Sequence, residues 1–273
     1  MKNKFSVLMS VYYKEKPEYL KLAIDSVINQ TLKPNEIVIV EDGKLTDELE
    51  KVISEYEKKY KFIKVIRFEK NRGLGIALNE GIKHCSYDYI ARMDSDDVSL
   101  PNRFEIQIGF MNKYPQIDVI GSNICEYDIS LEKKLNNKIV PESNEDIYKY
   151  MKKRNPFNHM TVIYKKTKVI TAGSYIDCPG FEDYYLWARM ASNKCNFYNI
   201  QENLVKARTD VNMIYRRGGK EYNKYIISFE NKIKKIGVIN SFECLCGIAI
   251  RVIVSSLPIR FRTYFYKYKL RNN

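Results

Sequence analysis

Histidine is scarce in this sequence, and its cysteines do not occur in the pairs typical of metal or redox sites. The 273 residues include two histidines and six cysteines, and no two cysteines have the Cys-x-x-Cys spacing. Structural zinc sites are built from Cys and His ligands at such short spacings, so a zinc site is not expected. We interpret the cysteines as reduced thiols, which indicates a cytosolic protein.

Long apolar segments are also missing. Residues 1–4 lead directly into a short apolar strand, without the apolar core and cleavage site of a signal peptide, so secretion is not expected. Residues 242–257 are largely apolar but contain Glu243 and Arg251. A helix needs about 20 apolar residues to cross a bilayer, so this segment is too short to span it.

Acidic residues are sparse in the C-terminal quarter of the chain. Residues 206–273 contain 15 Lys/Arg and 4 Asp/Glu, which leaves 31 Lys/Arg and 29 Asp/Glu in the first 205 residues. The net charge of +13 therefore belongs mostly to a C-terminal segment. We expect one catalytic domain over residues 1–210 and a basic helical segment over residues 211–273.

The first third of the chain alternates between short apolar segments and helical patterns. Strands are expected at 5–12, 36–40, 63–68 and 87–93, and helices at 17–30, 46–60 and 73–84. This alternation predicts an α/β fold with a mostly parallel central sheet and helices on both faces. Further along, the sequence predicts strands near 138–140 and at 160–164, and a long helix over 212–236.

Polar side chains follow the successive predicted strands where each strand ends. Tyr12, Asp42, Asn71 with Arg72, and Asp94 all occupy such positions. Open α/β sheets bind their ligands at the carboxyl edge of the strands, so we expect these side chains to line one site. Each of them taken alone could be an ordinary loop residue.

Three acids end the fourth predicted strand. Because side chains alternate along extended backbone, Asp94 and Asp96 can point the same way, with Asp97 beside them. Oxygen-rich sites select hard divalent ions such as Mg²⁺ or Mn²⁺, so this cluster is a candidate metal site. Solvated turn residues, or the Asp-x-Asp of an aspartyl-phosphate phosphatase with Asp94 as nucleophile, remain alternatives. A calcium loop fits badly, because Ser99 stands where its turn glycine is required.

Two further features of the sequence are a pair of glycines and a predicted helix that begins with two acidic residues. Gly73-x-Gly75 resembles part of a dinucleotide-binding motif, but it follows the third strand and Leu78 replaces the last glycine, so a nicotinamide site is rejected. Glu182 and Asp183 begin a predicted helix, where the helix dipole alone would favour acids. The same stretch holds the single tryptophan, Trp187, among other aromatic rings on which a sugar acceptor could stack.

Together these features resemble the family 2 glycosyltransferases of bacterial polysaccharide synthesis, whose fold is called GT-A. The resemblance covers residues 5–208 and rests on ordered motifs: Ser10-Val11-Tyr12-Tyr13, Glu41-Asp42-Gly43, Asn71-Arg72-Gly73-Leu74, Arg92-Met93-Asp94-Ser95-Asp96-Asp97, Asn158-His159 and Glu182-Asp183-Tyr184. It implies transfer of a sugar, with inversion, from a nucleotide diphosphate donor, for which we expect a UDP-sugar, to a glycan hydroxyl.

The resemblance also implies roles for individual residues. The donor would be held by Ser10, Tyr12, Glu41, Asp42, Asn71, Arg72 and Asp94, and the divalent ion, Mn²⁺ or Mg²⁺, by Asp94, Asp96 and Asp97. Asp183 would be the general base, because a carboxylate can accept the acceptor's proton as the new bond forms. Glu182, Trp187 and His159 would contact the acceptor, although a lone His before a strand is often structural.

One motif differs from the pattern of the family, and three arginines have two possible roles. Glu41-Asp42-Gly43-Lys44 replaces the Asp-Asp-Gly-Ser of many relatives, so either acid could contact the base. Arg208, Arg216 and Arg217 could close over phosphate or form a solvated basic face.

The C-terminal segment combines apolar, basic and aromatic residues, most densely over 260–269. This composition is typical of segments that lie on anionic lipid, so we expect a cytoplasmic enzyme, peripheral on the inner face of the cell membrane, with a lipid-linked glycan acceptor. A packing helix with a solvated tail is one alternative, and a nucleic-acid groove is another, although residues 5–208 give no support for nucleic acid.

Three other functions remain open at this stage. A phosphatase would use Asp94 as its nucleophile, and a nucleotidyltransferase would share the sheet and the metal but lacks its glycine-rich first loop here. A non-catalytic nucleotide-sugar-binding protein is the third.

Overall fold

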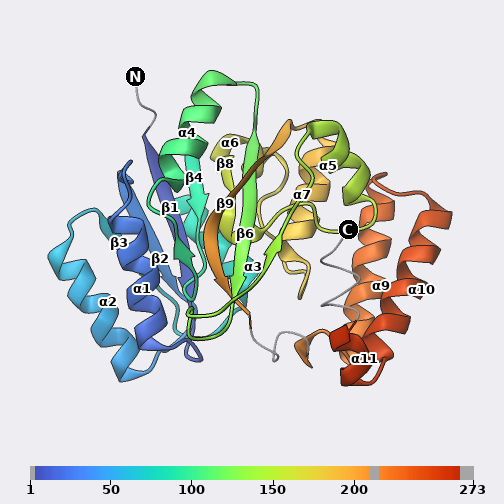
Figure 1. Ribbon diagram of the computed structural model, residues 1–273, viewed down its shortest axis with the longest axis horizontal. Coiled ribbons are helices and arrows are strands. Elements are labelled where there is room, and N and C mark those ends of the chain that lie inside the picture. The colour runs from blue at the N-terminus through green and yellow to red at the C-terminus, as the bar shows by residue number, and fades with distance from the viewer. Residues whose placement is uncertain (1–3, 210–214, 265–273) are drawn as a thin grey trace.

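The computed structural model describes residues 4–209 and 215–264, which form one central sheet with helices packed on it (Figure 1). The first four strands are β1 (Phe5–Val11), β2 (Glu36–Glu41), β3 (Ile63–Arg67) and β4 (Tyr89–Arg92). They are parallel and lie in the order β3-β2-β1-β4. The predicted α/β fold with a mostly parallel central sheet is confirmed.

The second half of the sheet is mixed. It contains β5 (Val98–Ser99), β6 (Val119–Tyr127), β7 (Lys134–Lys138), β8 (Ile163–Lys165) and β9 (Phe197–Arg208). β8 joins β4 to β6 through antiparallel pairings, and β9 lies parallel to β6. The described strands thus form one nine-stranded sheet with the order β3-β2-β1-β4-β8-β6-β9-β5, and β7 pairs with β6.

Helices cover both faces of this sheet, and each face has its own apolar core. α1 (Pro17–Ile28), α2 (Asp47–Lys59) and α4 (Arg103–Lys113) pack on one face. α3 (Leu74–His84), α5 (Asn144–Met151), α6 (Lys166–Thr171) and α7 (Glu182–Ser192) pack on the other. The alternation of side chains along β1 supplies both cores, because Val7 and Met9 face the first and Leu8 faces the second.

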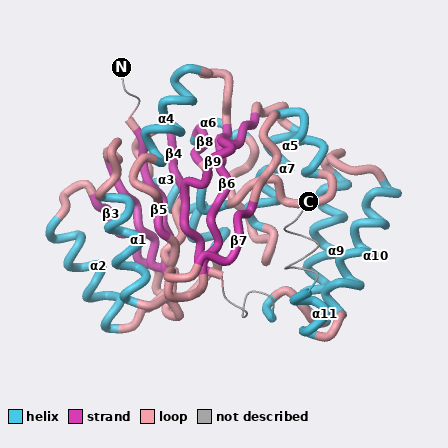
Figure 2. The backbone as a smooth tube through the Cα atoms, in the orientation of Figure 1, coloured by secondary structure: helices cyan, strands magenta, loops and turns pink. Residues whose placement is uncertain are grey.

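The chain ends in three helices at one side of the molecule: α9 (Lys220–Lys235), α10 (Ser241–Ser256) and α11 (Ile259–Tyr264). Figure 2 shows α9 beside the helices on the sheet and α10 at the periphery. α9 joins the core through Phe229, whose ring stacks on Phe181 at 4.4 Å between centroids. The C-terminal segment therefore packs on the sheet domain, and the division at residue 210 stays a prediction.

Several predicted element boundaries need correction. The strand expected at 160–164 is a 3-10 turn, η1 (His159–Thr161), followed by β8, and the strand expected at 138–140 lies earlier, as β7. The long helix expected from residue 212 begins at Lys220 among the described residues, after Gly219 with φ +91°. Residues 265–269 of the basic and aromatic stretch at 260–269 lie outside the described residues.

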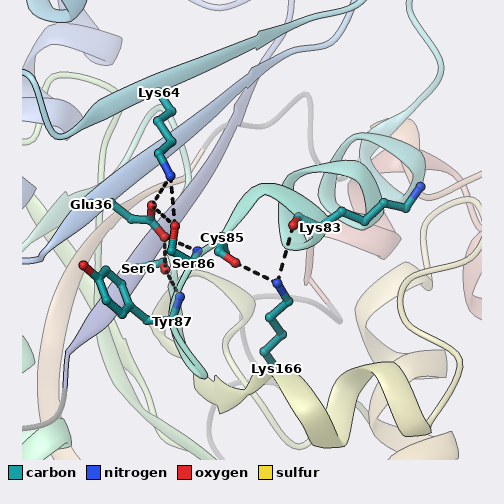
Figure 3. Close-up of polar contacts among 8 residues, drawn as sticks. All are labelled: Ser6, Glu36, Lys64, Lys83, Cys85, Ser86, Tyr87 and Lys166. Atoms are coloured by element: carbon teal, nitrogen blue, oxygen red, sulfur yellow. Dashed lines mark hydrogen bonds and ion pairs between the residues drawn. The ribbon is translucent and has the colours of Figure 1, made fainter.

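A buried carboxylate ties the starts of three strands together, at the edge of the sheet opposite the predicted site (Figure 3). Glu36 is 4% exposed and accepts hydrogen bonds from Ser6 Oγ at 2.5 Å, from the amide of Ser86, and from Lys64 Nζ at 2.7 Å. Burial by itself raises the pKa of Glu36, but these donors outweigh it and hold the pKa below its usual value.

Glu36→Gln should therefore destabilise the fold by about 2 kcal/mol at pH 7, since a charge-assisted network loses its anion. The pKa of Glu36 in the folded state lies below its unfolded-state value of about 4.3. The difference in the free energy of unfolding between wild type and variant is therefore complete above that pH, and it decreases as the pH falls through the folded-state pKa. Urea unfolding of both proteins between pH 3 and 8 measures this difference. Glu145→Gln, in an exposed pair with Lys149, is the control and should change stability little. A constant difference down to pH 3 would contradict the prediction.

Candidate active site

The carboxyl ends of the first strands meet at one edge, as the sequence predicts. Val11 pairs with Glu41, and Glu41 pairs with Arg67, so the residues after β1, β2 and β3 come level with one another. Tyr12 at the end of β1 is 37% exposed. Its ring is open to a ligand at this edge.

Asp42 organises the loop that follows β3. It is 4% exposed and accepts hydrogen bonds from Asn71 Nδ2 at 3.0 Å, from the Arg72 amide at 2.7 Å and from the Gly73 amide at 3.0 Å. Gly43 allows this close approach, since it has φ +90° and a Cβ there would lie 2.4 Å from the Asn71 nitrogen. Both oxygens of Asp42 are thus committed to positioning residues 71–73.

Glu41 faces the opposite side of the sheet, the side covered by α1 and α2, as do Ile37 and Ile39 of the same strand. It is 2% exposed and pairs with Arg67 Nε at 3.3 Å. Burial raises its pKa to about 7, against the opposing charge of Arg67. The predicted contact between Glu41 and a nucleobase does not fit this position, and of the two acids only Asp42 lies on the loop that reaches the edge.

Arg72 and its neighbours border an open cavity of ≈ 380 Å³. The Arg72 guanidinium lies 5.2 Å from the centre of the Phe68 ring, and its backbone is held by Asp42. Ser10, half-buried, precedes the end of β1 on the face of the sheet shared with Leu8. Tyr12, Asn71 and Arg72 are therefore accessible at the predicted edge, with the backbone of the 71–73 loop fixed beneath them.

The three acids after β4 come together, and the predicted proximity of Asp94 and Asp96 is confirmed. Ligand oxygens of Asp94, Asp96 and Asp97 all lie within 4.8 Å of one another. Asp97 is 2% exposed and accepts a hydrogen bond from the Arg208 amide at 2.8 Å, which ties the cluster to the end of β9. Burial, with the charges of Asp94 and Glu15, raises the pKa of Asp96 to about 7.

Two buried arginines, to which the sequence analysis assigns no role, lie beneath these acids. Arg92, 2% exposed, forms an ion pair with Asp94. Arg103 is fully buried and donates from Nη2 to the carbonyl of Arg92 at 2.8 Å and from Nε to Gln107 Oε1 at 3.0 Å. Burial and the neighbouring charge of Arg92 lower the pKa of Arg103 to about 9. Two cations therefore face three carboxylates, which leaves a surplus of negative charge for a divalent ion.

Arg208 lies at the same cluster. Its guanidinium is 3.9 Å from the centre of the Tyr19 ring, and its Nε and Nη1 are buried without hydrogen-bond partners. Guanidinium donors without a protein partner are free to bind an anionic ligand. Arg216 and Arg217 are exposed, and Arg217 also interacts with other groups of the protein.

Asp183 lies in the first turn of α7, at the positive end of the helix dipole. Its Oδ2 accepts a hydrogen bond from Asn155 Nδ2 at 2.6 Å, and its Oδ1 accepts from the Tyr184 amide at 2.7 Å. Burial raises the pKa of Asp183, and these two donors and Arg92 oppose the rise. The result is a carboxylate with a raised proton affinity that is held in one orientation.

Glu182 connects this helix start to the loop that Asp42 positions. Its Cγ would lie 3.2 Å from a Cβ at Gly75, so the absence of a side chain in α3 lets the two helix starts meet. Burial raises the pKa of Glu182 to about 7. Glu182 and Asp183 are partly exposed, so both remain candidates to contact a ligand.

The expectation that Trp187 contacts an acceptor is wrong. Trp187 is fully buried, with ring centroids 5.3 Å from Phe157 and 6.2 Å from His159. Phe181, Tyr184 and Tyr185 are also buried. α7 packs among α3, α6 and α9, so its aromatic residues fill the core instead of forming a sugar platform.

His159 is held inside the site by Tyr175, whose Oη lies 2.7 Å from His159 Nε2. Burial and the charge of Arg92 keep the pKa of His159 well below its usual value, so the ring is neutral. This arrangement matches the structural alternative for His159, and the acceptor contact stays untested.

Comparison with known proteins decides between the functions left open. The family model described as "Glycosyl transferase family 2" matches residues 6–177. The chain belongs to glycosyl transferase family 2. This membership favours a glycosyltransferase over the phosphatase and nucleotidyltransferase readings, and it confirms the resemblance to enzymes of bacterial polysaccharide biosynthesis.

Two curated relatives match almost the whole chain. An Escherichia coli protein named UDP-Gal:alpha-D-GlcNAc-diphosphoundecaprenol beta-1,3-galactosyltransferase is 39% identical over 98% of this chain and 97% of its own length. The amylovoran biosynthesis glycosyltransferase AmsE of Erwinia amylovora is 37% identical over 96% of this chain and 98% of its own length.

The fold also matches solved structures of the GT-A type. A mannosyltransferase of Pyrobaculum calidifontis, solved with GDP-Man and Mn²⁺, has a TM-score of 0.63 over 97% of this chain and 80% of its own, with 12% identity. At this identity the likeness establishes the fold alone.

Asn155 was missed by the sequence reasoning, and its effect on Asp183 is testable. Removing a hydrogen bond to a part-buried carboxylate costs its charged form about 1.5 kcal/mol, so Asn155→Ala should raise the pKa of Asp183 by about one unit. Because a base must be deprotonated to act, the acidic limb of the activity profile should move to higher pH by the same amount. The measurement is kcat/KM for sugar transfer against pH, with Asn193→Ala as an exposed control. An unshifted profile would show that Asn155 does not tune Asp183.

Proposed function

We propose that the protein is a metal-dependent, inverting glycosyltransferase that moves a sugar from a UDP-sugar to a hydroxyl of a lipid-linked glycan. The observation that carries this proposal is the pairing of two sites on one sheet edge: a carboxylate cluster after β4 and a single part-buried, oriented carboxylate, Asp183, at the start of α7. Arg92 links them, since its charge acts on the pKa of Asp96 and of Asp183.

The chemistry follows from these positions. Asp183 accepts the proton of the acceptor hydroxyl as its oxygen bonds to the anomeric carbon, and the bond from that carbon to the diphosphate oxygen breaks on the opposite side. A single attack from the face opposite the leaving group inverts the configuration. The raised pKa of Asp183 favours proton acceptance in a partly dry site.

Asp94, Asp96 and Asp97 would hold the divalent ion, because three carboxylates over two buried arginines form a hard, oxygen-only donor set. When bound, such an ion supplies Lewis-acid stabilisation of the departing nucleoside diphosphate. The Mn²⁺ in the Pyrobaculum structure supports the same assignment. The free Nε and Nη1 of Arg208 would add positive charge beside the diphosphate.

The donor and the acceptor are proposed from the edge residues and from the E. coli relative, whose name specifies UDP-Gal and a diphosphoundecaprenol-linked acceptor. Tyr12 would stack on the base, and Asn71 and Arg72, held by Asp42, would contact the base or the diphosphate. A lipid-linked acceptor agrees with a peripheral position on the cytoplasmic face of the cell membrane. Among the described residues, no helix has the length and apolarity needed to cross a membrane.

Metal binding should depend on pH around neutrality. The pKa of Asp96 is about 7 without an ion, so binding must displace a proton below that pH. We expect the affinity for Mn²⁺ to fall at least about tenfold per pH unit below pH 7, because burial also raises the pKa of Asp97, a second ligand, well above its usual value. Titration followed by the Mn²⁺ EPR signal between pH 5.5 and 8.5 measures this directly. Asp96→Asn should bind weakly at every pH, and a flat affinity in the wild type would remove Asp96 from the site.

The proposed reaction is tested with a panel of UDP-, GDP- and dTDP-sugars in Mn²⁺ or Mg²⁺. One donor should release its nucleoside diphosphate, the release should require the metal, and it should fall at least ~100-fold in Asp96→Asn. With acceptor present, Asp183→Asn should lower kcat about 1000-fold while donor binding is kept, since it removes only the base.

Asp146→Asn, at an exposed position of α5, is the matched control and should keep full activity. Transfer that survives Asp183→Asn would remove Asp183 as the base. Donor binding without release or transfer in any condition would favour the non-catalytic nucleotide-sugar-binding alternative. Inversion is read from the anomeric configuration of the product by NMR.

A further inference from the structure

α10 is attached to the molecule by one face only. Its inward residues follow helical spacing: Cys244 is buried, Ile248 and Val252 pack against the core, and Ser255 is 4% exposed. In Figure 1, α9 lies between α7 and α10, and α10 forms the outer edge on that side. The opposite face of α10 is therefore directed away from the protein.

That outward face is apolar. Phe242 is 75% exposed, Leu245 67%, Ile250 64% and Ile253 63%, and Cys246 and Ala249 lie between them. A helix that is apolar on all sides is normally buried, so an exposed apolar helix face is unusual. Single apolar residues scattered over a surface need no explanation, but these residues form one continuous stripe.

The two charged side chains of α10 are both used internally. Glu243 closes the capping box with Asn240 and pairs with Lys152 Nζ at 3.0 Å. Arg251 pairs with buried Glu230 at 2.7 Å and donates to the carbonyl of Lys153 at 2.8 Å. Neither charge interrupts the apolar stripe.

α11 extends the exposed apolar surface with two aromatic rings. Phe261 is 62% exposed and Tyr264 is 56% exposed, three residues apart on one helix face. Arg262 turns inward, where it is 8% exposed and donates to the carbonyl of Ser255 at 3.1 Å. Aromatic rings of this kind are favoured at the boundary between lipid and water.

Basic residues lie near both ends of α10. Lys149 and Lys152 of the α5 region are exposed on the side that contacts Glu243, Lys234 and Lys235 end α9, and Arg260 is exposed in α11. The C-terminal quarter of the chain has the surplus of positive charge described above. An apolar stripe with cationic residues near its ends complements a surface that offers both acyl chains and negative headgroups.

We propose that the outward face of α10, with Phe261 and Tyr264 of α11, docks on the surface of an anionic lipid bilayer. In this arrangement α10 lies in the plane of the interface, with its apolar stripe among the acyl chains and the lysines at the headgroups. This inference deepens the proposed function and rests on it only for the acceptor, because binding to lipid needs neither donor nor metal.

The docking surface is also connected to the candidate base. Arg251 lies 5.9 Å from the centre of the Phe181 ring and 5.6 Å from that of Tyr184, the residues on either side of Glu182 and Asp183. α10 thus contacts the start of α7 through Arg251.

The test is flotation of the full-length protein with vesicles, without nucleotide or metal. Vesicles of phosphatidylcholine with 30% phosphatidylglycerol are compared with pure phosphatidylcholine, at low and high salt. We expect the protein to float with the anionic vesicles, and the combined substitution Leu245→Glu with Ile253→Glu to lower the bound fraction at least tenfold. Both side chains are exposed, so the thermal unfolding temperature should be unchanged.

Ile170→Glu is the matched control, since Ile170 is 53% exposed on α6, and it should bind vesicles like the wild type. Equal flotation of the wild type and the double variant, or none by either, would overturn the proposal. A wild-type dimer in sedimentation that the double variant converts to monomer, without vesicle binding, would instead assign this face to a second copy of the chain.

Activity measurements separate this inference from the proposed function. The double variant should keep the donor hydrolysis of the wild type in solution and lose transfer only to an acceptor presented in vesicles. Vesicle binding by a protein that acts on no donor would support the docking surface while the proposed transfer fails. Transfer without vesicle binding would support the proposed transfer and overturn the docking surface.

Discussion

The site depends on the balance between three carboxylates and two buried guanidinium groups at the end of β4. Asp94, Asp96 and Asp97 could not share so small a volume without compensation, because like charges at this distance repel strongly in a partly dry environment. Arg92 provides an ion pair from within the same strand, and Arg103 supports the carbonyl of Arg92 from α4. Compensation is incomplete, and the remaining negative charge is what makes the cluster suited to a divalent cation.

A second set of contacts aligns the rest of the edge with this cluster. The carboxylate of Asp42 accepts hydrogen bonds from the backbone amides of Arg72 and Gly73, and that loop leads into α3. Gly75 of α3 lies close to Glu182 at the start of α7. The base candidate is then oriented by Asn155 from a loop before η1. Residues that are distant in sequence are thus held in one arrangement by backbone contacts, which leaves the exposed side chains of Tyr12 and Arg72 for ligands.

The C-terminal helices pack against the start of α7. Phe229 of α9 stacks on Phe181, and Arg251 of α10 covers the rings of Phe181 and Tyr184 while its charge is neutralised by Glu230. The segment is therefore part of the support of α7, although its outer face is unlike the surface of a protein that is surrounded by water alone. The same helix both stabilises the site and presents an apolar face to the surroundings.

The sequence by itself determined the parallel half of the sheet and the carboxyl edge, because continuous apolar runs such as 36–40 and the turns after them follow local rules of strand periodicity. It also singled out Asp94, Asp96 and Asp183, since clustered acids stand out against apolar strands and aromatic helices. Only the tertiary structure decided which face each neighbouring residue takes: Glu41 points under α2, whereas Asp42 reaches the 71–73 loop. The same holds for Trp187, whose buried ring packs against Phe157, His159 and Tyr164 outside its own helix. It also holds for Arg103 and Asn155, which donate hydrogen bonds to Arg92 and Asp183 on other parts of the fold. Burial and charge pairing are properties of packed elements, and no local pattern of residues specifies them.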